Sequence, residues 1–203
     1  MDAILNDMKF LAQFLAFGLC ASLPALAGVD LTPHFVSVGG GLIHRAYFAD
    51  GEKQYSMTID GDTELTGENG VAVFRFTNVS QATMTLRPTP FPKPAPFTPE
   101  FLPDYAKAAE AMLPHAAEGT ELASQGENIF PINKWKSYRY TFRYRIGGLG
   151  FEESITFLVL DSGQQIVIQT GSQRKDFPGI AARADDTIRR WNLVEPGDEV
   201  GAN

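Results

Sequence analysis

The sequence predicts an α+β fold in which one antiparallel β-sheet is flanked by helices on both faces. Three observations predict it: strand patterns follow one another over 137–171, two hairpin patterns precede them, and helical patterns lie at 100–113 and from Pro178 to about Asn192. A sheet with one apolar face and one partly apolar face needs a cover on both sides. We therefore expect the two helices to enclose the sheet as an α/β/α sandwich.

Residues 1–27 have the layout of a secretory signal peptide. The apolar run Phe10–Leu23 precedes an Ala-Leu-Ala cleavage site that ends at Ala27. The region before this run is basic only if translation starts at Met8. The run is shorter than the roughly 20 residues that a membrane span requires. We therefore predict an exported protein, periplasmic or secreted, with no membrane span after cleavage.

Cleavage after Ala27 would leave 176 residues, enough for one domain with a substantial core. It would also remove Cys20, the one cysteine, so the mature chain would have neither a disulfide nor thiol chemistry. The formal net charge of −7 becomes −6 without the two aspartates and one lysine of the signal peptide, and this acidic balance argues against nucleic-acid binding. We divide the rest of the chain into a lead-in segment (28–41), a single α+β domain (42–193) and a polar tail (194–203).

Two hairpins are predicted in the first half of the domain. Leu42–Ala49 and Gln54–Ile59 flank an Asp-Gly dipeptide, which is typical of tight hairpin turns. Val71–Thr77 and Ala82–Arg87 form the second hairpin pattern. Asp60–Glu64, between the hairpins, lacks the glycine and glutamate that an EF-hand spacing requires, so we expect a solvated acidic turn there.

Pro88–Pro99 contains six prolines in twelve residues and therefore predicts an extended connector. Thr98 is placed to cap the helix that follows, Glu100–Leu113, whose apolar residues recur at helical spacing. The residues from His115 to Asn128 are mostly polar and predict a loop.

Residues 137–146 alternate strictly, with aromatic and apolar side chains on one face and arginine or threonine on the other. If each of the two turns that follow has four residues, Phe157 of the middle strand pairs with Tyr140 of the preceding strand. On its other side, Phe157 pairs with Ile168 of the following strand. This register puts the large apolar residues of all three strands on one face, whereas a slip by one residue would scatter them.

The two helices are expected to cover opposite faces of this sheet. The apolar stripe of the C-terminal helix consists of Ile180, Ala184, Ile188 and Trp191. We expect this stripe on the aromatic face and the helix 100–113 on the face that carries Leu158 and Val167. Asp185 and Arg189, four residues apart, would pair on the wet side of the C-terminal helix.

The order of these elements resembles that of the PsbP-like fold, named for an extrinsic subunit of photosystem II. The segments NKWKSYRYTFRYRI, EESITFLVLDSGQQIVIQT and KDFPGIAARADDTIRRWNL resemble its closing strands and last helix, and the likeness spans about Tyr55–Leu193. The resemblance implies an antiparallel sheet between helices, in exported accessory proteins. It transfers no functional residue and no single function.

The sequence contains no recognisable catalytic motif. His34, His44 and His115 are too scattered for a metal site, and G-x-S-x-G is absent. Glu152 and Glu153 are neighbours in a strand, so their side chains point to opposite faces and cannot act together. We therefore expect no catalytic residue, no metal and no cofactor.

Glu153 is an exception on the aromatic face. The expected register places it at the rim of that face, opposite Tyr144. We expect its carboxylate to be exposed to solvent at the sheet edge, with Arg183 or Arg189 as its ion-pair partner.

The first functional hypothesis is an exported accessory or binding domain without catalytic activity, whose partner is an envelope protein. Its candidate binding residues are the basic row Arg139, Arg143 and Arg145 together with Trp135. The alternative interpretation of that row is a solvated strand face partly under a helix.

The second hypothesis is a hydrolase or a lipid-handling protein. It requires a pocket between the sheet and the helix 100–113, lined by the aromatic face. Filling of that space by Phe101, Tyr105 and Met112 would rule out such a pocket.

Overall fold

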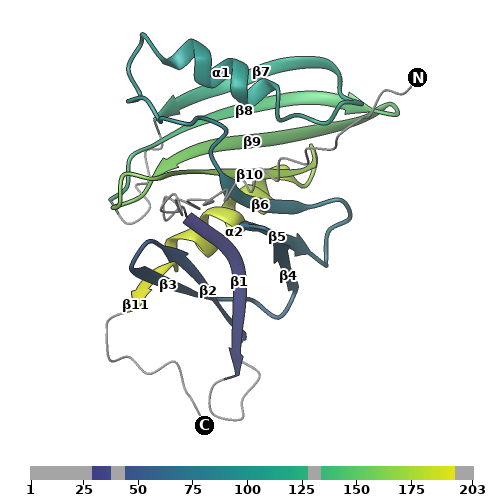
Figure 1. Ribbon diagram of the computed structural model, residues 1–203. Coiled ribbons are helices and arrows are strands. Elements are labelled where there is room, and N and C mark those ends of the chain that lie inside the picture. The colour runs from purple at the N-terminus through teal and green to yellow at the C-terminus, as the bar shows by residue number, and fades with distance from the viewer. Residues whose placement is uncertain (1–28, 38–43, 128–133, 195–203) are drawn as a thin grey trace, which may run out of the picture.

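The structure is a computed structural model, and it describes residues 29–37, 44–127 and 134–194 (Figure 1). The predicted signal peptide, the glycine run at 39–41 and residues 195–203 of the predicted tail lie outside the described residues. The described residues form two antiparallel sheets and two helices, α1 (Leu102–Glu110) and α2 (Phe177–Arg189).

The larger sheet has seven strands in the order β4-β5-β6-β10-β9-β8-β7. Its strands are β4 (Thr63–Glu68), β5 (Val71–Phe76), β6 (Thr83–Pro88), β7 (Glu118–Glu127), β8 (Ser137–Ile146), β9 (Leu149–Val159) and β10 (Gln165–Gln173). The predicted second hairpin is confirmed as β5 and β6, and the three consecutive strands as β8, β9 and β10.

The smaller sheet has four strands in the order β1-β2-β3-β11. They are β1 (Val29–Ser37), β2 (His44–Asp50), β3 (Lys53–Thr58) and β11 (Asn192–Val194). The predicted first hairpin is confirmed as β2 and β3. β11 follows α2 and pairs with β3, which ties the end of the domain to this sheet (Figure 1).

The fold is α+β and mostly antiparallel strand, but it has two sheets where one was expected. α2 and the smaller sheet together supply the core on one face of the larger sheet, while α1 lies on the other side (Figure 1). The cover of the first face is therefore largely a second sheet, and a helical layer on each face is not the arrangement of this chain.

Strands β1, β4 and β7 arise where the sequence predicted a lead-in segment, an acidic turn and a loop. β7 is exposed along most of its length and pairs only with β8, so nothing in its burial requires apolar alternation. β4 is likewise an edge strand with one buried residue, Leu65. An edge strand that is held mainly by backbone hydrogen bonds needs few apolar side chains, so its sequence shows little of the alternation by which a strand is predicted.

The turn between β8 and β9 is shorter than predicted. Gly147 and Gly148 both have positive φ, 57° and 82°, and form a two-residue turn. Tyr140 therefore pairs with Ile155 rather than with Phe157. A shift of two residues keeps each side chain on its predicted face.

The turn between β9 and β10 is longer than predicted, and this changes the faces. Five residues, 160–164, connect Val159 to its partner Gln165. Val167 consequently pairs with Phe157 and joins the aromatic face. Ile168 pairs with Thr156 and moves to the opposite face, because a slip of one residue reverses every side chain of a strand.

The two helices are exchanged relative to the prediction. Tyr105 and Ala109 of α1 pack in one cluster with the aromatic residues of β8 and β9. The apolar stripe of α2 packs in the other cluster, with Leu158 and Ile168. The physical reason is the register of β10, which provides an aliphatic surface on the face that α2 covers. The predicted cap is absent as well, since α1 begins after Phe101 without a side-chain cap from Thr98.

Candidate functional site

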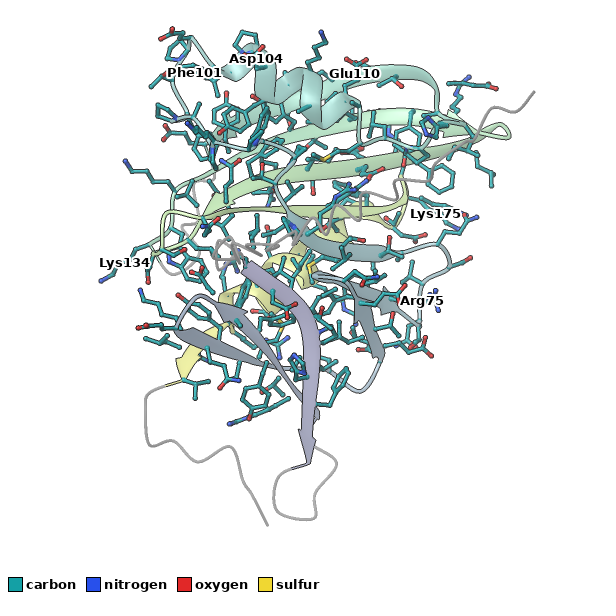
Figure 2. All side chains as sticks on the ribbon, viewed as in Figure 1. Arg75, Phe101, Asp104, Glu110, Lys134 and Lys175 are labelled. Atoms are coloured by element: carbon teal, nitrogen blue, oxygen red, sulfur yellow. The ribbon has the colours of Figure 1, made fainter. Side chains whose placement is uncertain are left out.

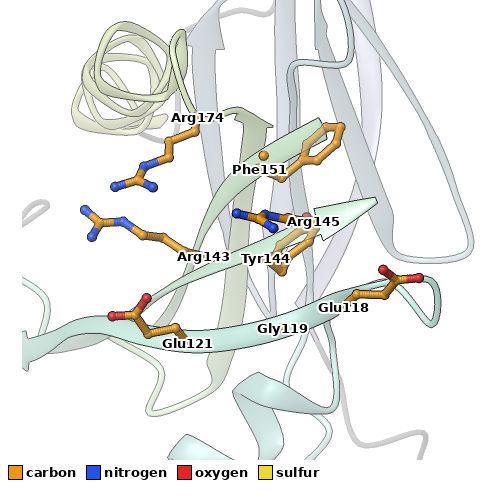
Figure 3. A pocket seen from close by; sticks show the side chains of 9 residues that line it. Glu118, Gly119, Glu121, Arg143, Tyr144, Arg145, Phe151 and Arg174 are labelled. Carbon is orange, nitrogen blue, oxygen red and sulfur yellow. The ribbon is translucent and has the colours of Figure 1, made fainter. Parts of the chain in front are cut away.

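A pocket of about 460 Å³ lies at the end of β8 and contains three arginines. Its lining includes Arg143, Arg145, Arg174, Tyr144, Glu118 and Glu121. Figure 3 shows the guanidinium groups of Arg143 and Arg174 near each other, that of Arg145 further toward Phe151, and Glu118 and Glu121 along β7. We call this the arginine pocket.

Strand geometry explains how these side chains meet. Arg143 and Arg145 occupy alternate positions of β8, so both point away from the aromatic face. Arg145 faces Gly150 on β9, whose missing side chain leaves the space beside it open. The backbone N–H of Arg174 donates to the carbonyl of Gly150 at 3.0 Å, which brings the residue after β10 to the same place.

The charges of the arginine pocket are only partly paired. Arg143 Nε donates to Glu152 Oε2 at 3.0 Å, and Arg174 Nε lies 3.8 Å from the same oxygen. Arg145 is exposed and makes no ion pair within the part of the chain that the structure describes. Two guanidinium groups thus share one carboxylate while the third makes no ion pair with a described residue, and planar guanidinium donors match carboxylate and phosphate groups.

The structure separates the four residues predicted from the sequence as a binding surface. Arg143 and Arg145 lie in the arginine pocket. Arg139 lies between β8 and α2, where its Nη2 and Nη1 donate to the two carboxylate oxygens of Asp185 at 2.6 and 3.1 Å. Trp135 is 5% exposed, and its Nε1 donates to Asp161 at 2.8 Å.

Arg174 was missed in the sequence because it follows β10 outside any alternating pattern. Only the pairing of β10 with β9 brings it beside Gly150. Predicting five residues in the turn 160–164 would have given the correct register of β10, and this register places Arg174 beside Gly150.

Glu153 is buried behind the arginine pocket, contrary to the prediction of a wet rim position. It is 4% exposed, and the hydroxyl of Tyr144 donates to its Oε2 at 2.5 Å. Gln169 Nε2 donates to its Oε1, and Arg87 Nη2 donates in turn to Gln169 Oε1. Arg183, one of the expected partners, instead donates to Asp62 at 2.7 Å.

This burial changes the protonation of the network. Desolvation raises the pKa of Glu153, and the hydrogen bonds from Tyr144 and Gln169 offset only part of that effect. Desolvation and the neighbouring Glu153 raise the pKa of Tyr144 as well. The Tyr144 hydroxyl therefore stays protonated and serves as a donor to Glu153.

The pocket hypothesised between α1 and the sheet is filled. Tyr105 and Ala109 are fully buried there, and Phe101 and Met112 pack against the same cluster. This outcome rules out a hydrolase or lipid site at that place.

Within the described residues, no three His, Cys, Asp or Glu side chains are grouped so as to hold a metal ion. No helix in the same part of the chain is long and apolar enough to cross a membrane.

Comparison with known proteins gives similarities of structure alone. No protein-family model matches the chain, and no curated protein matches it. A cyanobacterial PsbP from Synechocystis is similar at a TM-score of 0.49 and 14% identity, with 78% of this chain and 98% of that chain covered. PsbP is thus among the similar structures, in agreement with the resemblance seen in the sequence.

Two further solved structures are similar over most of their length. A Pseudomonas aeruginosa protein of unknown function, PA94, gives a TM-score of 0.46 at 10% identity, covering 81% of this chain and 97% of its own. LpqN, involved in cell envelope biogenesis of Mycobacterium tuberculosis, gives 0.43 at 11% identity, covering 82% and 92%. At these scores the similarities carry no conclusion about function.

Proposed function

We propose that this chain is an exported accessory domain that binds an acidic segment of an envelope protein through the arginine pocket, without catalysis. The observation that supports the proposal is the charge of that pocket. The lining carries Arg143, Arg145 and Arg174 together with Glu118 and Glu121. Arg143 and Arg174 both lie against the carboxylate of Glu152, and Arg145 makes no ion pair with any described residue.

Glu152 gives the pocket a defined shape. Its side chain is only 15% exposed, and its carboxylate holds Arg143 and, more loosely, Arg174 at fixed positions on the sheet. Arginines held in place lose less side-chain freedom when they bind a carboxylate, which favours recognition. Because the pocket is open to water, each new ion pair contributes only about 1 kcal/mol and weakens as salt is added.

The chemistry of the pocket wall supports binding rather than catalysis. The polar side-chain groups of the described lining are guanidinium groups and carboxylates, since the hydroxyl of Tyr144 donates to the buried Glu153. An arginine guanidinium remains protonated in proteins and therefore does not act as a base.

The test compares binding of a hexaglutamate peptide and a hexaglutamine peptide by isothermal titration at low salt. We expect the natural chain to bind hexaglutamate at least tenfold more tightly than hexaglutamine. Arg145→Glu combined with Arg174→Glu should weaken the binding of hexaglutamate at least tenfold.

The matched control is Arg45→Glu combined with Arg75→Glu, which makes the same change in charge at exposed positions outside the pocket. This variant should bind hexaglutamate almost as well as the natural chain. If both double variants bind hexaglutamate equally weakly, the effect is one of net charge and the proposal is wrong. The proposal is also wrong if the natural chain does not bind hexaglutamate.

A further inference from the structure

A second pocket, of about 580 Å³, lies at the other end of β8. Ser137, the first residue of β8, lines it, whereas Arg145 near the last residue lines the arginine pocket. Eight residues of extended strand separate the two, which corresponds to roughly 26 Å. The second pocket is therefore a separate site, and its ligand is independent of the function proposed for the arginine pocket.

Internal hydrogen bonds fix one wall of this pocket, formed by the proline segment. The hydroxyl of Tyr105 donates to the carbonyl of Ala95 at 2.6 Å, and Gln165 Nε2 donates to that hydroxyl at 2.9 Å. The ring of Phe97 packs on the ring of Tyr105, with 5.1 Å between the centroids. Prolines 94 and 96 restrict the backbone between these points. The apolar wall is thus held in place before any ligand arrives.

The opposite wall is equally fixed. Trp135 packs edge-on against Tyr55 and Trp191, with 5.5 and 5.8 Å between the centroids. Its Nε1 donates to Asp161, and the neighbouring carbonyl of Lys136 accepts from the N–H of Val159 at 2.9 Å. Preformed pockets of this size are typical of small-molecule sites.

Polar groups converge on one side of this apolar space. Ser137 is 6% exposed, and its hydroxyl is buried without a hydrogen-bond partner. This oxygen is covered by protein atoms, so it is not among the groups that a ligand in the pocket would reach. Lys134 and Lys136 also line the pocket; both are exposed and neither makes an ion pair with a described residue. Among the described residues of the lining Glu127 is the single acid, so their charge favours an anion.

We propose that this pocket binds a small apolar molecule that ends in a carboxylate, of the class of medium-chain fatty acids. The hydrocarbon chain lies against Pro94, Pro96 and Phe97. The carboxylate pairs with the ammonium groups of Lys134 and Lys136, which are both exposed in the lining. The site differs from the space under α1 that the sequence suggested for a lipid.

The test is isothermal titration with dodecanoate and with dodecanol, both below the concentration at which they aggregate. We expect saturable binding of dodecanoate, and binding of dodecanol at least tenfold weaker because the carboxylate is missing. The double variant Lys134→Ala with Lys136→Ala should bind dodecanoate at least tenfold more weakly, and its affinity for dodecanol should be unchanged.

Lys175→Ala is the matched control, since Lys175 is exposed and lies at the opposite end of the sheet from Lys134 (Figure 2). It should bind dodecanoate as the natural chain does. Absence of saturable binding, equal affinity for dodecanol, or equal affinity of the double-lysine variant would overturn the proposal. Arg145→Glu with Arg174→Glu should keep its dodecanoate affinity, which separates failure of this site from failure of the arginine pocket.

Discussion

The arginines of β8 share one face of the strand but have different environments. Arg139 is 24% exposed and is held by both oxygens of Asp185. Arg143 is tied to Glu152, and Arg145 stands open in the pocket. The alternation in the sequence predicts their common face. Which of them is covered depends on where α2 packs, and that is decided by residues far away in the chain.

For Glu153 too, the sequence predicts the face of the sheet but not the burial of the side chain. The sequence places it on the aromatic face, and this is what the structure has. Its burial could not be predicted, because it depends on Gln169 and Arg87, which β10 and β6 bring beside it only after the sheet has formed.

We predict that Glu153→Gln flattens the pH dependence of stability. A raised pKa means that the folded chain holds a proton that the unfolded chain releases above about 4.5, the ordinary value for glutamate. This contribution to the free energy of unfolding is present below that pH and is lost as pH rises, by up to about 1.4 kcal/mol per pH unit. Glutamine carries no proton to lose, so the variant should gain stability relative to the natural chain as pH rises.

Urea unfolding between pH 4 and pH 8 measures this difference. Glu64→Gln, at an exposed position of β4, is the control and should follow the natural chain at each pH. Parallel curves for the natural chain and Glu153→Gln would show that the buried carboxyl does not titrate as described.

At the scale of elements, one extra residue in the 160–164 turn decides the packing. It turns Val167 toward the aromatic residues and Ile168 toward α2. The amphipathic pattern of α2 was readable in the sequence, and its apolar stripe is confirmed. The face on which it docks was predicted wrongly, because hydrophobic residues occupy adjacent positions of β10 and both registers bury apolar side chains.

The contact of α2 with β8 gives a direct prediction. In a double-mutant cycle of Arg139→Ala and Asp185→Ala, we expect a coupling free energy of about 1–2 kcal/mol, since the pair is bidentate and about three-quarters buried. The sequence had suggested that Asp185 pairs with Arg189 along the helix instead.

The control cycle is Arg75→Ala with Glu64→Ala, an exposed pair at 3.5 Å, whose coupling should stay below about 0.5 kcal/mol. Chemical unfolding of the single and double variants provides both values. A coupling for Arg139 and Asp185 no larger than the control would mean that α2 does not pack on this face.

At the scale of the whole molecule, two sheets share one core through α2 and a cluster of aromatic rings. Trp191 lies within 5.3 to 5.8 Å of Phe48, Tyr55 and Trp135, measured between ring centroids, so side chains of β2 and β3 meet the segment that precedes β8 around it. This core leaves the two ends of β8 free to carry separate pockets. The α+β class was predictable, and so was the hairpin of β2 and β3. That this hairpin forms a second sheet was not, because its pattern does not show that it pairs with β1 and β11 and not with the larger sheet.

The most direct test of the arginine pocket is to map where an acidic peptide binds. In nuclear magnetic resonance spectra recorded during a hexaglutamate titration, the largest shifts should fall on the side-chain Nε–H groups of Arg145 and Arg174 and on the amide of Gly150 between them. The signals of Arg45 and Arg75 should move little. Shifts spread evenly over all exposed arginines, or centred outside the pocket, would contradict the proposed binding function.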